Sequence, residues 1–404
     1  MSHTSSPSTK PRCYYCGNNP TSHTMAKVDS FVLLFLNPHI FPLLRTWFGR
    51  VIVSITEVLY AGMVQLFLVT GIAKFTTDHT VITSDRGAVM AEESDRRGWV
   101  METLIVFGHV HDAYRLQLPS GQRIFFSGIP RLDPIKNAIA GWMDDKAVLK
   151  AKLLAAGVTA SQGASFIRWS SAKRYFLAQK QAVIVKPRFG SRGRHTTTHI
   201  TTLEQFEAAF WRAKQLNISV IVEEHLVGSV YRATMVGGKL AGVLTGEPPR
   251  ITGDGIHTIT ELVKLKNDSR PARVGEVIIR DINIAFLARQ NYTPDTILTV
   301  GTTIDLIEKI GLSYGGLSRE DTPRVHPKLR IELERASLVV DDPIHGFDFI
   351  SPDISADPDT VRWGIIECNS VPFINLHHDP LVGIPVNVAG ILFSDLAKNC
   401  SKFL

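Results

Sequence analysis

Alternating apolar and polar positions predict short strands and amphipathic helices along much of the chain. The strands predicted from apolar runs in the first part are residues 80–83, 99–108, 114–118 and 123–126. A Pro-Ser-Gly-Gln turn separates the last two strands, which indicates a hairpin. We therefore expect a domain of apolar helices and a small α/β region within residues 31–140.

The middle of the chain shows a different pattern, in which buried strands alternate with helices. Apolar residues at helical spacing predict a helix over residues 144–157, which begins at an aspartate and ends at a glycine. Strands are predicted at residues 182–187 and 219–226, with a helix over residues 203–215 between them. The first of these strands ends in a lysine, and the second contains two glutamates.

A glycine-rich run, Arg188-Phe-Gly-Ser-Arg-Gly-Arg-His195, follows the first of these strands. Its two glycines would let backbone amides approach a polyphosphate, and its arginines add positive charge. A tight hairpin with solvated arginines explains the run equally well, so both interpretations stay open. The run is not a Walker A sequence, because no Gly-Lys-Ser or Gly-Lys-Thr follows it.

Two later apolar runs carry oxygen side chains that suit a hard cation. Gly346-Phe-Asp-Phe-Ile350 contains Asp348, and Trp363-Gly-Ile-Ile-Glu-Cys-Asn369 contains Glu367 and Asn369. Glu367 and Asn369 are two positions apart in a predicted strand, so their side chains point to one face. Carboxylate and amide oxygens suit Mg²⁺, which completes its shell with water and nucleotide phosphates. Solvated strand ends are the alternative for any one such pair.

The segment at residues 31–75 is markedly apolar. Its longest uninterrupted part, Val58 to Ala73, has 16 residues between Glu57 and Lys74, which is shorter than the roughly 20 residues of a membrane span. Prolines and arginines interrupt the part before it. We therefore expect a buried or interfacial helix, and membrane association through residues 31–75 stays open as the less favoured alternative.

Length and composition narrow the classes of protein. The 404 residues allow two to three domains, the 44% hydrophobic content is enough for real cores, and 20% charged residues do not suit a wholly disordered chain. A formal net charge of +6 favours anionic ligands. No nucleic-acid partner is expected, because no Lys/Arg run reaches five and no basic stripe is interleaved with aromatic residues.

The 4 cysteines are too few and too scattered for a disulfide framework, so we expect a reducing, cytoplasmic compartment. The polar N-terminus lacks the apolar stretch of a secretory signal, and residues 1–30 are expected to be a flexible tail. Within that tail, Cys13 and Cys16 form a CxxC turn closed by Gly17, which has the shape of a zinc knuckle. Only His23 lies near, and no second CxxC follows. Zinc binding, free thiols and the remnant of a lost site therefore all stay open.

The order of the elements resembles the ATP-grasp fold, an α+β fold in which two α+β subdomains clasp ATP. A lysine opens a helix, and a Val-Lys-Pro strand, a glycine-rich loop, a Val-Glu-Glu strand end and the strands of Asp348 and Glu367 follow. The sequence is most similar to the ATP-grasp domain of cyanophycin synthetases and bifunctional glutathione synthetases, over about residues 141–395. The matching motifs are Gly253-Asp-Gly-Ile-His-Thr, Leu312-Ser-Tyr-Gly-Gly316, Val325-His-Pro327 and Asn375-Leu-His-His-Asp-Pro380.

The resemblance implies an ATP-grasp domain over residues 141–404, with a lid subdomain at about residues 180–230, and it implies a role for each candidate residue. The residues implied for phosphate binding are Lys146, Lys186, Gly190, Ser191, Arg192 and Gly193. Those implied for adenine and ribose are Glu223, Glu224, His225 and Leu226. The implied catalytic residues are Arg232, which would face the γ-phosphate, and Lys186. The implied ligands of two Mg²⁺ ions, or of Mn²⁺, are Asp348, Glu367 and Asn369.

The sequence departs from the family pattern at three places. Glu308-Lys-Ile-Gly311 stands where the family has an arginine–asparagine pair that belongs to phosphate binding. Thr245-Gly246 and Val386-Asn387 stand where the family has arginines. The last two departures suggest a substrate different from those of the named families.

The resemblance as a whole implies an ATP- and Mg-dependent carboxylate-amine ligase. Such an enzyme forms an amide or peptide bond through an acyl phosphate and releases ADP and phosphate. Its partners would be a small carboxylate and an amine, expected to be amino acids or peptides, and we expect a homo-oligomer. Two alternatives stay open, namely an ATP-dependent small-molecule kinase and a non-catalytic ATP-binding regulatory module.

Overall fold

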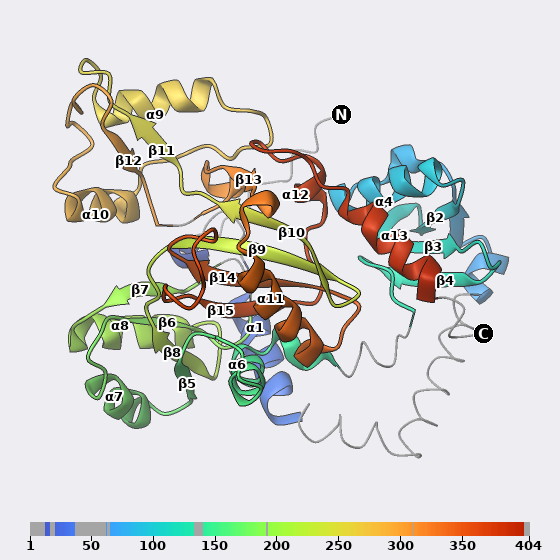
Figure 1. The fold of residues 1–404 in the computed structure, drawn as a ribbon, viewed down its shortest axis with the longest axis horizontal. Coiled ribbons are helices and arrows are strands. Elements are labelled where there is room, and N and C mark those ends of the chain that lie inside the picture. The colour runs from blue at the N-terminus through green and yellow to red at the C-terminus, as the bar shows by residue number, and fades with distance from the viewer. Residues whose placement is uncertain are drawn as a thin grey trace. The chain divides into compact units, whose positions relative to one another are not determined.

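The structure is a computed structural model, and the residues that it describes form two compact units (Figure 1). The described residues are 13–16, 21–36, 62, 65–132, 140–190, 193–308 and 310–399. The smaller unit takes its residues from 1–41 and 162–225, and the larger unit takes its residues from 42–161 and 226–404. Each unit thus contains two separate stretches of the chain.

The smaller unit is built on an antiparallel sheet of four strands. Its strands lie in the order β5 (Gly163–Phe166), β8 (Val220–Glu224), β6 (Val183–Pro187) and β7 (Thr197–Ile200). Its helical elements are η1 (Tyr14–Cys16), α1 (His23–Phe31), η2 (Val32–Leu36), α7 (Trp169–Leu177) and α8 (Leu203–Lys214). Aromatic rings of α7 and α8 meet in its core, where the ring centroids of Phe176 and Phe206 lie 4.4 Å apart. The two strands and the helix predicted for this region are confirmed.

A five-stranded antiparallel sheet forms the centre of the larger unit (Figure 1). Its strands lie in the order β13 (Ser318–Glu320), β10 (Lys239–Gly246), β9 (Ser229–Val236), β14 (Ile344–Ser351) and β15 (Gly364–Asn369). Helices α6 (Lys146–Ala155) and α11 (Pro327–Val340) cover one face, where their leucines join Phe347 and Phe349 in a buried cluster. The helix predicted from residue 144 is therefore confirmed as α6.

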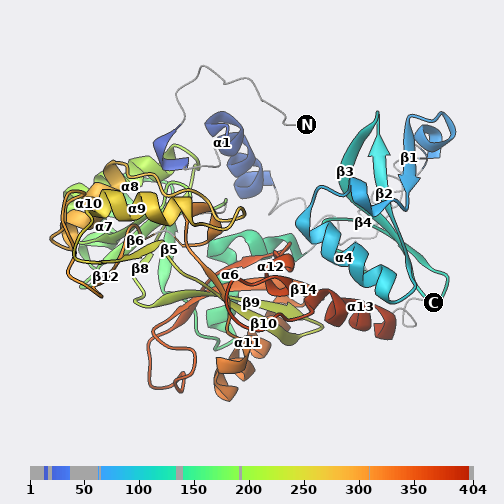
Figure 2. The ribbon, with the colours of Figure 1, turned by 90° about the horizontal axis from the view of Figure 1, so that it is seen from above.

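A second antiparallel sheet in the larger unit has four strands in chain order. These are β1 (Ala73–Thr76), β2 (Val100–Val106), β3 (His109–Gln117) and β4 (Arg123–Ser127). Helix α4 (Asp85–Arg96) packs on β2, and α13 (Val388–Asn399) packs beside α4 and on β9 and β10 of the central sheet (Figure 2). In the shared hydrophobic cluster, Trp99 stacks on Phe393 of α13 with ring centroids 5.3 Å apart. The C-terminal helix therefore packs with elements from the first third of the chain.

The remaining elements of the larger unit surround a small core of their own. Strands β11 (Arg250–Thr252) and β12 (Thr303–Asp305) pair, and they pack with helices α9 (Ile259–Asp268) and α10 (Asp281–Arg289). The short helices are η3 (His79–Val81), η4 (Ala140–Asp144), η5 (Leu312–Tyr314), η6 (Thr322–Arg324) and α12 (Asn375–His378).

The strand predicted at residues 80–83 is wrong. A short helix, η3, stands there, because the Asp78 side chain accepts hydrogen bonds from the backbone amide of Thr80 at 3.0 Å and from its hydroxyl at 2.6 Å. Ser84 then caps α4 by accepting a hydrogen bond from the backbone amide of Gly87 at 3.3 Å. Two side-chain caps so close together leave no room for a strand.

Two predictions concern the first 75 residues. Part of the expected flexible tail forms helix α1, and Ser22 caps that helix. Most of the apolar segment at residues 31–75 lies outside the described residues. Among the residues that the structure does describe, no helix has the length and apolar character needed to cross a membrane.

His345 on β14 links the stability of the larger unit to pH. Its side chain is 0% exposed, Nδ1 lies 3.1 Å from the carbonyl oxygen of Asp342, and Nε2 has no hydrogen-bond partner among the described residues. Burial lowers the pKa of His345 from 6.5 to about 3. The unfolded chain therefore takes up this proton first as the pH falls. The stability that the neutral histidine contributes is fully present above about pH 6.5 and is lost as the pH falls towards 3.

We expect His345→Leu to reduce this sensitivity to acid. Below the pKa that His345 has in the unfolded chain, this residue should lower the free energy of unfolding of the wild type by up to about 1.4 kcal/mol per pH unit. The variant should lack this contribution to the pH dependence. Urea unfolding between neutral and mildly acid pH measures the slope. His111→Leu, which removes an exposed histidine of β3, is the control. Equal slopes in the two variants would contradict the prediction.

Candidate functional site

Two acidic side chains, flanked by two basic ones, lie side by side at the central sheet of the larger unit. Arg232 on β9, Asp348 on β14 and Glu367 on β15 occupy paired positions on three adjacent strands. Arg232 donates two hydrogen bonds of 2.7 Å, from Nε and Nη2, to the two carboxylate oxygens of Asp348. Lys146, the first residue of α6, places its Nζ 3.3 Å from Oε2 of Glu367. We call these four residues, Arg232, Asp348, Glu367 and Lys146, the charge row.

The alternation of side chains along β9 explains one end of the charge row. Tyr231 and Ala233 point into the core under α6 and α11, so Arg232 between them points to the opposite face of the sheet. Asp348 lies between Phe347 and Phe349 of β14, which also belong to that core. Apolar neighbours on both sides therefore fix both members of the ion pair on the same face.

A β-bulge between β14 and β15 sets the orientation of Glu367. Asp348 pairs with Glu367, but the next residue, Phe349, pairs with Ile365, so Ile366 is the extra residue. Because of this bulge, Ile365 and Cys368 both lie in the core although an odd number of positions separates them. The side chain of Glu367 therefore points to the opposite face of the sheet, which is the face of Arg232 and Asp348.

The N-terminus of α6 places Lys146. The Asp145 side chain caps the helix by accepting hydrogen bonds from the amides of Ala147 and Val148 at 3.0 and 3.3 Å. Lys146 is 6% exposed, and Lys150, one turn further along, is 4% exposed. Lys150 was not among the predicted site residues, although its spacing from Lys146 puts both on one helix face.

The residues predicted to bind Mg²⁺ fit a cation. The carboxyl groups of Asp348 and Glu367 lie within hydrogen-bonding reach of each other. Burial and the Glu367 carboxylate raise the pKa of Asp348, against the opposing effect of Arg232. Neighbouring carboxyl groups repel each other when both are ionised, and oxygen ligands of this kind suit Mg²⁺.

In the smaller unit, the predicted nucleotide residues centre on a buried ion pair. Nζ of Lys186 on β6 lies 2.5 Å from Oε1 of Glu223 on the neighbouring strand β8. Lys186 is 7% exposed and Glu223 is 1% exposed. A buried lysine of this kind stays charged only beside a carboxylate, so the pair fixes one ammonium group at the end of the sheet.

The other residues predicted to bind the nucleotide in this part of the chain make different contacts. Oε1 of Glu224 accepts a hydrogen bond from the backbone amide of Gln162 at 2.7 Å, and the amide of His225 donates to the carbonyl oxygen of Ala182 at 3.1 Å. Leu226 is buried and is the first residue after the boundary between the units. Gly190 and Gly193 have φ angles of 104° and 60°, which favour glycine. Ser191 and Arg192 lie outside the described residues.

A buried polar chain beside the charge row was not predicted. Oγ1 of Thr234 lies 2.8 Å from Nε2 of His377, and Nδ1 of His377 lies 2.6 Å from Oε2 of Glu320. All three residues belong to the larger unit and are buried. Thr234 follows Arg232 by two positions and so shares its face, which is the one feature of the sequence that could have indicated it.

Two arginines of the larger unit are held by carboxylates. Arg250 pairs with Glu247 at 3.1 Å and with Asp305 at 2.5 Å. Arg273 pairs with Asp379. These interactions tie together surface loops of the larger unit.

Comparison with known proteins gives relatives for part of the chain. No model of a protein family matches. Cyanophycin synthetase of Trichormus variabilis is 31% identical over 223 residues, which are 54% of this chain and 25% of that protein. The glutathione biosynthesis bifunctional protein of Mannheimia succiniciproducens is 30% identical over 277 residues, which are 63% of this chain and 36% of that protein.

Comparison of structures extends the similarity to the fold. A bifunctional glutathione synthetase from Pasteurella multocida matches with a TM-score of 0.56 and 24% identity, over 78% of this chain and 43% of that chain. The chain thus spans between 25% and 36% of the length of the two curated relatives named above. The predicted α+β fold is confirmed. Sequence and fold together show that this chain is a relative of the ATP-grasp ligases, similar to parts of the cyanophycin synthetases and of the bifunctional glutathione proteins.

Proposed function

We propose that this protein is an ATP- and Mg-dependent carboxylate-amine ligase that forms an amide or peptide bond through an acyl phosphate. The observation that carries the proposal is the charge row, in which Arg232 and Lys146 flank the two neighbouring carboxyl groups of Asp348 and Glu367. Fixed cations beside a metal-binding carboxylate pair stabilise the charge of a phosphoryl group in transfer. The names of the relatives, which describe the synthesis of cyanophycin and of glutathione, support the same class of reaction.

Arg232 is the proposed catalytic residue of the charge row. Nε and Nη2 are held by Asp348, so the planar guanidinium is fixed and its remaining N–H groups can be presented to phosphoryl oxygens. Burial lowers the pKa of Arg232, but the charge and hydrogen bonds of Asp348 outweigh it and raise the pKa above its ordinary value. The guanidinium is therefore always charged. Its position, rather than its protonation, is what the protein controls.

The chemistry divides into two displacements. A carboxylate oxygen of the first substrate attacks the γ-phosphorus of ATP, and ADP leaves. The amine of the second substrate then attacks the carbonyl carbon of the acyl phosphate, and phosphate leaves with the carboxylate oxygen. Mg²⁺ held by Asp348, Glu367 and Asn369 would neutralise charge on the nucleotide phosphates. Lys146 beside Glu367 would contribute a further positive charge.

The other assignments stay predictions of the sequence. They include nucleotide contacts by Lys186, by the loop of Gly190, Ser191, Arg192 and Gly193, and by Glu223, Glu224, His225 and Leu226. Amino acids or peptides are the proposed substrates, by analogy with the products that the relatives are named for. A homo-oligomer, a cytoplasmic location and the absence of a nucleic-acid partner are likewise expectations.

Phosphate release from Mg-ATP tests the proposed function. The purified protein is given amino acids and dipeptides singly and in pairs, and products are identified by mass spectrometry. We expect phosphate release that needs a particular pair, with a product lighter than the two reactants by one water. A phosphorylated single substrate would instead indicate a kinase. ATP binding without turnover on any pair would favour the regulatory module.

A further inference from the structure

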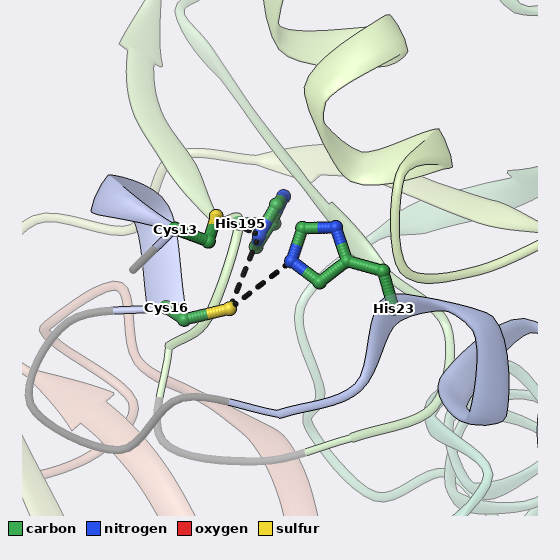
Figure 3. Close-up of side chains that lie close together, drawn as sticks. All are labelled: Cys13, Cys16, His23 and His195. Carbon is green, nitrogen blue, oxygen red and sulfur yellow. Dashed lines mark hydrogen bonds between the residues drawn. The ribbon is translucent and has the colours of Figure 1, made fainter. Parts of the chain in front are cut away.

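Four side chains with metal-binding atoms converge in the smaller unit (Figure 3). Cys13 and Cys16 come from the CxxC turn, His23 is the first residue of α1, and His195 ends the glycine-rich run after β6. Their sulfur and nitrogen atoms all lie within 4.8 Å of one another. The fourth member that the sequence analysis lacked is therefore His195, which follows Cys13 by 182 positions.

The distances within this cluster match the edges of a tetrahedral zinc site. With Zn–S bonds of about 2.3 Å and Zn–N bonds of about 2.0–2.1 Å, a sulfur and a nitrogen on one tetrahedral ion lie about 3.5 Å apart. Nε2 of His195 lies 3.3 Å from Sγ of Cys13 and 3.5 Å from Sγ of Cys16. Nε2 of His23 lies 3.4 Å from Sγ of Cys16. Each of these distances is a ligand-to-ligand distance of such a site.

The surroundings of His195 fix its ring in the tautomer that a metal needs. Nδ1 of His195 lies 2.8 Å from the carbonyl oxygen of Arg212, a bond in which the ring donates, so the lone pair is on Nε2 and points at the two sulfur atoms. The backbone amide of Thr21 donates to the sulfur of Cys16. Cys16 is 2% exposed and His195 is 1% exposed. A central cation would be bound by all four of these atoms at once, the two sulfur atoms and the two Nε2 atoms.

Backbone conformation and nearby contacts also hold the segments of the cluster together. His195 has a φ of 53°, a left-handed conformation that residues other than glycine seldom adopt. Its amide donates to the carbonyl oxygen of Tyr15, inside the CxxC turn, at 3.2 Å. Arg212 stacks over the Tyr15 ring with 4.1 Å between the guanidinium carbon and the ring centroid. Ser30 of α1 accepts a hydrogen bond from the amide of Ile218 at 3.1 Å.

We propose that Cys13, Cys16, His23 and His195 bind one structural zinc ion. Two thiolates and two imidazoles form a closed, tetrahedral set with no position left for a substrate, which is the composition of structural rather than catalytic zinc sites. The ion fastens the N-terminal segment to the C-terminal end of the glycine-rich run. It thereby restrains, at its His195 end, the loop that contains Gly190 and Gly193. The assignment of zinc to these four residues does not rest on the proposed ligase activity.

Metal content of the full-length protein tests the proposal. Protein purified without chelators or an affinity tag that binds metal should contain about one zinc ion per chain by elemental mass spectrometry. Cys16→Ser and His195→Gln should lose the ion. His199→Gln, which removes an exposed histidine of β7 in the same unit, should retain it. Zinc-free wild type after reconstitution with excess zinc would overturn the proposal, as would full zinc content in both ligand variants.

A measurement on the wild type alone covers the case in which the ligand variants do not fold. Co²⁺ exchanged into the protein should give the visible absorption of a tetrahedral ion with thiolate ligands, at a stoichiometry of about one per chain. Weak absorption typical of an octahedral ion, or a Cys13–Cys16 disulfide in protein isolated under reducing conditions, would contradict the site. Neither readout depends on turnover of ATP, so the zinc site and the ligase proposal can fail separately.

Discussion

Glu367→Gln is expected to lower Mg²⁺-dependent ATP turnover by roughly 10²–10³-fold, the range seen when one group that stabilises transition-state charge is removed. Glutamine keeps the volume and one oxygen of the side chain but loses the negative charge that holds Mg²⁺ and faces Lys146. The fold should persist, because the substitution also removes the repulsion between the carboxyl groups of Glu367 and Asp348. Initial rates at several Mg²⁺ concentrations, with circular dichroism of the same samples, measure both effects.

Glu102→Gln is a matched control for this experiment. Glu102 also lies on a strand of the larger unit, β2, and it accepts two hydrogen bonds of 2.6 and 2.8 Å from Arg115 of β3. The control removes the same charge from an ion-paired glutamate in a different sheet. Turnover in Glu102→Gln should stay near that of the wild type. If Glu367→Gln retained full activity, or if both variants lost it equally, the metal assignment would be wrong.

Arg232→Lys should have the second large effect, a fall of kcat by roughly 10²-fold or more with a smaller change of KM for ATP. Lysine keeps the charge but cannot reproduce the two parallel hydrogen bonds of 2.7 Å to Asp348, so the cation is no longer held in one position. The effect appears in kcat because the proposed role of Arg232 is to stabilise charge that develops during phosphoryl transfer. Steady-state kinetics with the substrate pair found by phosphate release measures it.

Arg115→Lys is the control for the general effect of losing two parallel hydrogen bonds between an arginine and a carboxylate. Arg115 makes the same two-bond contact with Glu102, outside the charge row. Its replacement should change stability by a similar amount and leave kcat nearly unchanged. If Arg232→Lys and Arg115→Lys had the same kcat, Arg232 would not be a catalytic residue.

Local pattern was sufficient for the strands and helices of the central part of the chain, but it could not determine how they pair. Period-two spacing correctly placed Glu367 and Asn369 on one face, yet it would put Ile365 on that face as well. The bulge at Ile366 places Ile365 in the core instead. The contact between Arg232 and Asp348 depends on the register of β9 and β14, which are far apart in the sequence.

Clusters of residues that are far apart in the sequence could not be predicted from local pattern either. The interpretation of Cys13 and Cys16 stayed open because His195 comes to them only through the fold of the smaller unit. The chain of Thr234, His377 and Glu320 was missed for the same reason. The false strand at residues 80–83 has the opposite cause, since side-chain caps, which are local, outweighed the β-branched residues.

Oxygen transfer is the most direct test of the acyl-phosphate mechanism. Amino acids and dipeptides labelled with oxygen-18 in their carboxyl groups are incubated with the protein and Mg-ATP, and the released phosphate is analysed by mass spectrometry. The mechanism predicts one labelled oxygen in each phosphate, because the attacking carboxylate oxygen leaves with the phosphoryl group when the amine displaces it. Unlabelled phosphate formed together with an amide product would contradict activation of the carboxylate by phosphorylation.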